Sequence, residues 1–248
     1  MILRRVIEHF RKQEWTAIAI DFVIVVVGVF IGIQVANWNA ARQDRADEML
    51  FLQRLHDDVG TTDALSRRVR KRRVEYLQAL RSAADVIFAD NGEPLTPEQC
   101  MAISASHFFN VATPELPSFA ELVSSGRLDI IRDASLRAEL LRFHQTREGL
   151  LQYMNFVNLG VYALPSKYPE LVRLRSYYDT ALQEMQSEAT CDLDAMRESQ
   201  AFKNDFSENV DRYDSYVRDG LGPWNDRLDA VHAGLDDALG IKHERTAP

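Results

Sequence analysis

Residues 15–38 read WTAIAIDFVIVVVGVFIGIQVANW, and this stretch decides the architecture of the chain. An α-helix of this length covers roughly 35 Å, which matches the hydrocarbon core of a bilayer and part of each interface. Tryptophan prefers the membrane interface, so Trp15 and Trp38 are typical of the two ends of a membrane span. We therefore predict one transmembrane helix over residues 15–38.

The residues around this span predict its orientation. Basic residues on a short tail are usually retained in the cytoplasm, and residues 1–14 include Arg4 and Arg5. We expect a cytoplasmic amphipathic tail over residues 1–14, with an unstructured basic tail as the alternative. Arg4, Arg5, Trp15 and Trp38 are predicted at the membrane interface. A good signal-peptidase site is lacking after the span, so we expect it to stay attached, with the C-terminal domain outside the cytoplasm.

One face of the predicted span carries small and polar residues. Gly28 and Gly32 form a GxxxG pair, and such small residues let a second helix approach closely within a membrane. Asp21 adds an ionisable side chain, which inside a span usually marks a functional contact. Because GxxxG also arises by chance in apolar helices, plain lipid exposure is the alternative. The candidate contact stripe consists of Asp21, Val25, Gly28, Gly32, Val35 and Asn39.

Residues 39–248 predict a helical bundle. Apolar residues recur at helical spacing in segments that are separated by glycine, proline and asparagine. Short connections between such amphipathic helices favour antiparallel neighbours. The predicted fold class is all-α: a single N-terminal transmembrane helix continuing into a helical bundle domain, with no paired strands. Expected features include a break or bend at 60–62, a helix start at Thr96, a glycine cap at Gly126, and helices over 136–161, 171–185, 202–217 and 224–235.

The charge of the chain excludes one broad class of function. The formal net charge is −8, and general nucleic-acid binding requires a basic surface that neutralises phosphates. The exception is the basic run RRVRKRR over residues 67–73. Either these charges pair with acidic residues of the segment 205–219, or they dock an acidic protein surface or a phosphate-bearing molecule. The candidate docking patch comprises Arg67, Arg68, Arg70, Lys71, Arg72 and Arg73.

Motifs for chemistry are lacking from the sequence. Cys100 and Cys191 are too few for a disulfide scaffold; either they form one long-range disulfide in an oxidising compartment or they are two separate thiols. The six histidines show no HExxH or related metal spacing, and no nucleophile or phosphate-binding motif occurs. His56 and the pair Asp236-Asp237 read as surface charge. We predict a protein that is not an enzyme and has no cofactor or metal site.

Two segments resemble a known family. Residues 28–39, GVFIGIQVANWN, carry a glycine, a glutamine and an Asn-Trp-Asn ending, and residues 121–128 read ELVSSGRL. Both are similar to segments of an uncharacterised bacterial family of small single-pass membrane proteins, which also has an acidic residue where Asp21 stands. Ala36 departs from the asparagine that is frequent in that family. The resemblance implies a bacterial single-pass membrane protein, and it implies no activity. With the orientation predicted from the basic tail, we expect an inner-membrane protein whose C-terminal domain is periplasmic.

Three classes of function follow from these features. As an accessory or scaffold subunit, for example of a respiratory or photosynthetic complex, the protein would pack its stripe on another membrane helix or on a second copy. As an extracytoplasmic ligand-binding or sensor module, it would hold a small molecule between helices and act through a separate partner. An enzyme would need residues brought together from distant parts of the chain. We expect the first, with the lipid bilayer and a membrane protein as partners and no nucleic acid.

Overall fold

The structure is a computed structural model that describes residues 15–89, 93–109 and 113–242. The predicted tail with Arg4 and Arg5, and the side chain of Trp15, lie outside what it describes. The chain divides into two compact units, Met1–Leu50 and Phe51–Pro248. The fold class is all-α as predicted, with one small two-stranded sheet added.

The first unit is formed by the N-terminal part of helix α2 (Trp15–Phe88). Its apolar side chains are exposed in the single chain, for example Phe22 at 69% and Val25 at 63%. By length and composition, α2 contains a segment long and apolar enough to cross a membrane. An apolar surface of this kind is costly in water and favourable in lipid.

The second unit begins with the remaining part of α2. The sequence predicts a break or a bend at 60–62. The break is wrong, because α2 continues through these residues without interruption, and the bend stays a prediction. The Thr61 hydroxyl donates a hydrogen bond to the Asp57 carbonyl at 3.0 Å, and Leu55, Val59 and Thr62 are buried along the helix. Packing of this apolar face outweighs the weak helix propensity of the local sequence.

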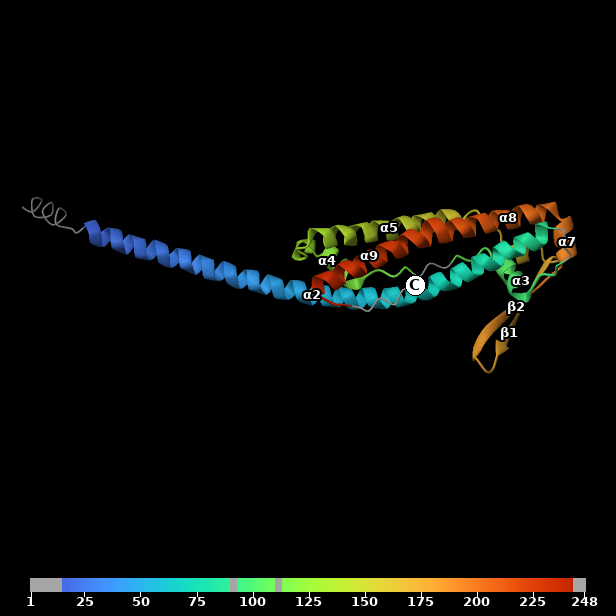
Figure 1. Ribbon diagram of the computed structural model, residues 1–248, viewed down its shortest axis with the longest axis horizontal. Helices are drawn as coiled ribbons and strands as arrows, with labels where there is room; N and C mark the ends of the chain where they lie inside the picture. The colour runs from blue at the N-terminus through green and yellow to red at the C-terminus, as the bar shows by residue number, and fades with distance from the viewer. Residues whose placement is uncertain (1–14, 90–92, 110–112, 243–248) are drawn as a thin grey trace, which may run out of the picture. The chain divides into compact units, whose positions relative to one another are not determined.

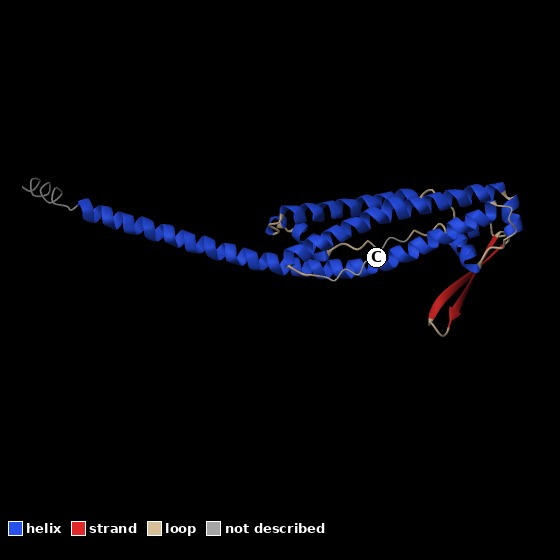
Figure 2. Ribbon diagram, viewed as in Figure 1, coloured by secondary structure: helices blue, strands red, loops and turns tan. Residues whose placement is uncertain are grey.

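Long helical segments build the bundle of the second unit together with the later part of α2 (Figures 1 and 2). α5 (Ala134–Asn158) and α9 (Gly222–Leu239) lie side by side along their length. α8 (Gln200–Ser215) leads into α9 through the π-helical segment η2 (Tyr216–Leu221). The shorter elements are α3 (Pro97–Ser104), α4 (Pro117–Ser124), η1 (Leu128–Ile130), α6 (Leu164–Lys167) and α7 (Leu193–Glu198).

Two helix ends are placed as the sequence predicts. The Thr96 hydroxyl accepts a hydrogen bond from the Gln99 backbone N–H at 3.2 Å, and the Gln99 side chain accepts one from the Thr96 N–H at 2.8 Å. This reciprocal capping box satisfies donors that the start of α3 leaves free. Gly126 follows α4 with a φ of 69°, a left-handed conformation that glycine adopts most readily.

The core of the bundle consists of two clusters of buried side chains. One joins α2, α4, α5 and α9, and it includes Trp224 and Phe143, whose ring centroids are 5.9 Å apart. The other joins the end of α2 to α8 through residues such as Leu80, Phe202 and Tyr213. Both clusters lie within the second unit, so this unit has a hydrophobic core of its own.

The helix predicted over 171–185 is wrong. β1 (Val172–Asp179) and β2 (Glu184–Cys191) form an antiparallel hairpin in which Val172 is opposite Cys191, drawn in red in Figure 2. β1 is rich in residues that favour strands, including two tyrosines. The Asp179 carboxylate accepts hydrogen bonds from the backbone N–H groups of Ala181 at 2.8 Å and Leu182 at 3.1 Å. This local turn reverses the chain and ends the strand.

Candidate functional site

The predicted contact stripe lies along the exposed part of α2. At about 100° per residue, its six members fall on one side of the helix. A Cβ atom added at Gly28 or Gly32 would meet no other atom within 4 Å. The two glycines therefore leave open space on the surface of the single chain, and a helix contact at this stripe stays a prediction. Farther along, the Arg42 guanidinium lies 5.9 Å from the centroid of the Trp38 ring.

The basic run on α2 is partly engaged inside the second unit. The Arg67 Nε donates to the Asp63 carboxylate at 2.8 Å on the same helix, and Arg73 donates to the Tyr213 hydroxyl at 3.3 Å. The contact of Arg73 with the segment 205–219 is thus to a tyrosine and not to an acidic residue. Arg81, which lies outside the run, forms an ion pair with the acidic Asp214. The other members of the run are exposed, and their use as a docking patch stays a prediction.

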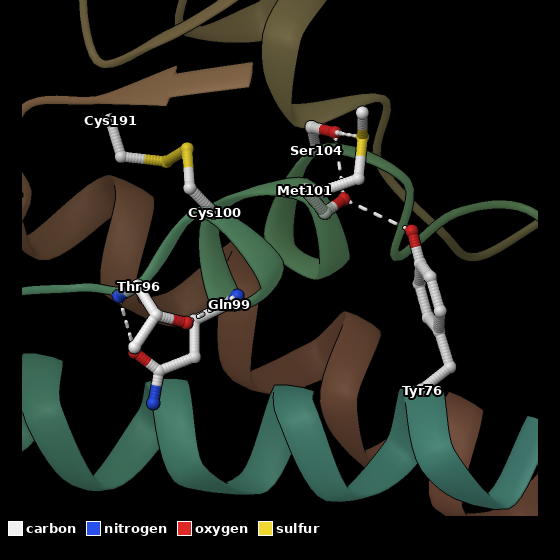
Figure 3. Close-up of a disulfide and its surroundings, with 7 residues drawn as sticks. All are labelled: Tyr76, Thr96, Gln99, Cys100, Met101, Ser104 and Cys191. Carbon is white, nitrogen blue, oxygen red and sulfur yellow. Dashed lines mark hydrogen bonds between the residues drawn. A yellow bond between two sulfur atoms is a disulfide. The ribbon is translucent and has the colours of Figure 1, made fainter. Parts of the chain in front are cut away.

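A disulfide joins Cys100 on α3 to Cys191 at the end of β2 (Figure 3). The two Cα atoms are 5.8 Å apart. Because Cys191 is paired in register with Val172, the bridge lies at the base of the hairpin. Of the two alternatives that the sequence leaves open for these cysteines, the structure contains the bridged one.

α3 is itself fixed to the bundle, so the hairpin base has a firm support. The Tyr76 hydroxyl on α2 donates to the Met101 carbonyl at 3.0 Å (Figure 3), and the Gln99 side chain donates to the Ser82 hydroxyl at 3.0 Å. Burial and, to a smaller extent, the nearby Tyr213 raise the pKa of Tyr76 to about 12, although the positive charge of Arg73 opposes this rise. The phenol is therefore neutral at physiological pH and available as a donor.

Beyond its base, the hairpin exposes apolar side chains. Leu182 is 62% and Met185 is 63% exposed, and Leu174, Tyr177 and Tyr178 are exposed on β1. Tyr178 is directly opposite Met185 in the ladder, so these two exposed side chains share one face of the hairpin. Exposed apolar patches mark sites of interaction with other molecules, and tyrosine and methionine are enriched at protein interfaces. Sequence reasoning assigned this segment to a helix and so missed the hairpin as a candidate site.

A groove of about 530 Å³ lies between α2, α3 and β2, next to the hairpin. Its wall on α2 includes Arg72 of the basic run and the acidic Glu75. Its other walls add the carboxylates of Glu98 on α3 and Glu188 on β2. The volume of the groove is large enough for a small molecule. The charged side chains that line it are mostly acidic.

Two residues that were expected to be surface charge meet between α2 and α9. The His56 Nε2 lies 3.1 Å from an oxygen of Asp236, and both side chains are mostly buried. The sequence signal is weak, because the two residues are far apart in the chain and only His232 and Asp236 share a local spacing, at i and i+4 on α9. The expectation of surface charge is wrong for His56 and Asp236.

Comparison with known proteins places the chain in one family. No curated protein and no solved structure matches the chain. The family DUF6090, a family of unknown function, matches residues 21–159. This segment starts at Asp21 and includes the contact stripe, the basic run, Cys100 and the glycine cap at Gly126. Since the match covers more than half of the chain, the protein belongs to the family of unknown function DUF6090.

Proposed function

We propose that this protein is a membrane-anchored interaction protein without enzymatic activity, an accessory or scaffold subunit of a larger membrane complex. In this proposal residues 15–38 cross the bacterial inner membrane, the N-terminus is cytoplasmic and the helical domain is periplasmic. Its partner is another membrane protein with a periplasmic portion. The observation on which the proposal mainly rests is the exposed apolar surface of the disulfide-anchored hairpin.

The hairpin supports a protein partner in particular. A two-stranded ribbon is marginally stable by itself in water, and this one has its base fixed to α3 by the disulfide while its apolar side chains stay exposed. Its exposed tyrosine and methionine side chains are residue types that are enriched at protein interfaces. A second protein that covers them removes this apolar area from water, at roughly 25 cal/mol per Å².

The disulfide supports a periplasmic location. Disulfides persist in oxidising compartments such as the bacterial periplasm and are rare in the cytosol. With one span, a periplasmic domain requires a cytoplasmic N-terminus, which agrees with the basic residues of the tail. The stripe with Gly28 and Gly32 supplies a second contact, because it lets a helix of the partner approach the span closely within the bilayer.

Site-specific photo-crosslinking in native membranes tests the proposal. A photo-reactive residue is placed at Leu182 on the hairpin and at Val25 on the stripe. Matched controls are Leu141, an exposed leucine on α5, and Phe30, which lies on the opposite side of the span at about 100° per residue. We expect Leu182 and Val25 to capture the same membrane protein and the two controls to capture it weakly or not at all.

A substitution sharpens this test. Gly28→Leu fills open space in the single chain, so it should leave the fold intact and lower the yield of the adduct at Val25. Val26→Phe adds the same number of carbon atoms, four, on the other side of the helix and should leave that yield unchanged. Adducts of the chain with itself alone, or equal yields at all four crosslinking positions, would contradict an accessory-subunit role.

The groove beside the hairpin favours a second candidate function, a ligand-binding or sensor module. Its volume of about 530 Å³ lies within the range of small-molecule sites. In that function a small molecule binds between α2, α3 and β2, and signalling passes through a separate partner. A compound that raises the Tm of the protein, and fails to do so after Ala189→Trp fills the groove, would support this function over the first.

A further inference from the structure

Two histidine and two aspartate side chains, all of residue types that bind metal ions, come together between α2 and α9. His56 and Asp63 come from α2, and His232 and Asp236 come from α9. We propose that His56, His232 and Asp236 bind a divalent transition-metal ion, zinc in particular, and that the ion links the two helices. This inference departs from the sequence-based expectation of no metal site, and it stands independently of the proposed function.

The donor atoms lie close to the separations that a zinc ion requires. One Asp236 oxygen lies 3.1 Å from the His56 Nε2 and 3.9 Å from the His232 Nε2. One ligand atom from each of the three residues lies within 4.8 Å of the other two. Zinc binds imidazole nitrogen and carboxylate oxygen at about 2.0–2.2 Å, so tetrahedral ligands stand roughly 3.3–3.6 Å apart. Small side-chain movements bring the three atoms to these positions.

The residues around His232 also suit a metal ligand, because they orient its imidazole ring. A metal-bound histidine typically donates its other ring N–H to a carboxylate, which fixes the tautomer and raises the basicity of the ligand. When Nε2 of His232 faces the ion, its Nδ1 faces an oxygen of Asp63 at 3.7 Å. Asp63 is held in turn by the Arg67 Nε at 2.8 Å. The first residue of the basic run therefore acts as a positioning residue for this site.

The charge and accessibility of the site also suit a cation. The two negative charges of Asp63 and Asp236 outnumber the single positive charge of Arg67. The site therefore attracts a divalent cation. The side chains of His56 and His232 are 19% and 20% exposed, which leaves a path for an ion. Two histidines and one aspartate supply three ligands, and a water molecule completes a tetrahedral set.

Metal binding by the full-length protein tests the inference directly. The protein is purified in detergent with an affinity tag that contains no histidine, treated with EDTA, and kept without reductant so that both cysteines stay bridged. Zn²⁺ is then titrated calorimetrically and the Tm is measured with and without the ion. We expect one saturable site per chain and a Tm that rises with Zn²⁺ concentration.

Conservative variants locate the site. His232→Gln and Asp236→Asn should each lower Zn²⁺ affinity by at least 100-fold, and Asp63→Asn by roughly 10- to 100-fold. The matched control is His144→Gln, a histidine on α5 whose ring lies against Phe119, and it should leave the affinity unchanged. The Tm of each variant without metal shows that it is folded.

The alternative is a hydrogen-bonded His–Asp pair that holds the helices together without an ion. It predicts that Zn²⁺, Co²⁺ and Ni²⁺ show no saturable site in the wild-type protein, and this result would overturn the inference whatever the variants do. Binding that persists at wild-type affinity in both His232→Gln and Asp236→Asn would overturn it equally, because the ion would then be bound elsewhere.

Discussion

Removal of the disulfide between Cys100 and Cys191 is expected to lower the free energy of unfolding of the second unit substantially. The bridge joins residues 91 positions apart. For a loop of that length, the chain-entropy model gives roughly 15.5 cal/mol/K, or about 4.6 kcal/mol at 25 °C. Domains are typically stable by about 5–15 kcal/mol, so this is a large share of the total. The hydrogen bond from Tyr76 to Met101 still holds α3 on the bundle, so the double variant should fold.

The assay is urea unfolding of the full-length protein in detergent, followed by tryptophan fluorescence. Trp224 is buried in the core of the second unit, and Trp15 and Trp38 are replaced by phenylalanine so that Trp224 alone reports. The variant Cys100→Ala/Cys191→Ala should unfold at a much lower urea concentration than its parent. A reductant should lower the midpoint of the parent and leave that of the variant unchanged. Equal midpoints, with the bridge verified in the parent by mass spectrometry, would refute this reasoning.

Three further predictions concern single residues of the second unit. The Asn209 side chain bonds both the backbone N–H and the carbonyl of Tyr162. Asn209→Ala removes both hydrogen bonds and should lower the free energy of unfolding in urea by about 2–3 kcal/mol. The control Asn204→Ala, at an exposed position, should lower it little. Gly126→Ala forces a side chain into a φ of 69° and should cost about 1–2 kcal/mol in the same assay. Burial raises the pKa of Tyr216 from 10.0 to about 12. The free energy of unfolding that the neutral Tyr216 phenol contributes should therefore be complete below pH 10 and decrease as the pH rises toward 12. In a titration followed by phenolate absorbance, Tyr216→Phe should remove one tyrosine that ionises late.

Much of the helical architecture could be predicted because its signals are local and strong. The long apolar segment of α2, the capping residues at Thr96 and the glycine cap at Gly126 each act within a few residues of the helix that they define. The amphipathic stripes of α5, α8 and α9 were likewise visible, because each of these helices buries one face.

The hairpin was missed because its apolar spacing is ambiguous. Residues four positions apart, such as Leu174 and Tyr178, share a face in a helix and also in a strand, whose side chains alternate with a period of two. Both faces of most of the hairpin are exposed, so burial imposes no alternating pattern on the sequence. The alternation of Val172 and Leu174 with Arg173 and Arg175 is the signal that favours a strand.

The His–Asp cluster could not be found from local spacing. His56 and His232 lie on different helices. The centroids of their rings are 5.3 Å apart because α2 and α9 pack together. Only tertiary structure determines that neighbourhood. The contact of the basic run with Asp63 on its own helix follows the i, i+4 rule and was accessible from sequence.

Extraction of native membranes with alkaline carbonate tests the central claim, that residues 15–38 hold the protein in a bilayer. The full chain, tagged at its C-terminus, should stay with the membrane pellet, and its intact mass should include the span. A chain lacking residues 15–38 should appear in the supernatant. Release of the full chain by carbonate would contradict the account. An intact mass that matches a chain starting after residue 38 would contradict it as well.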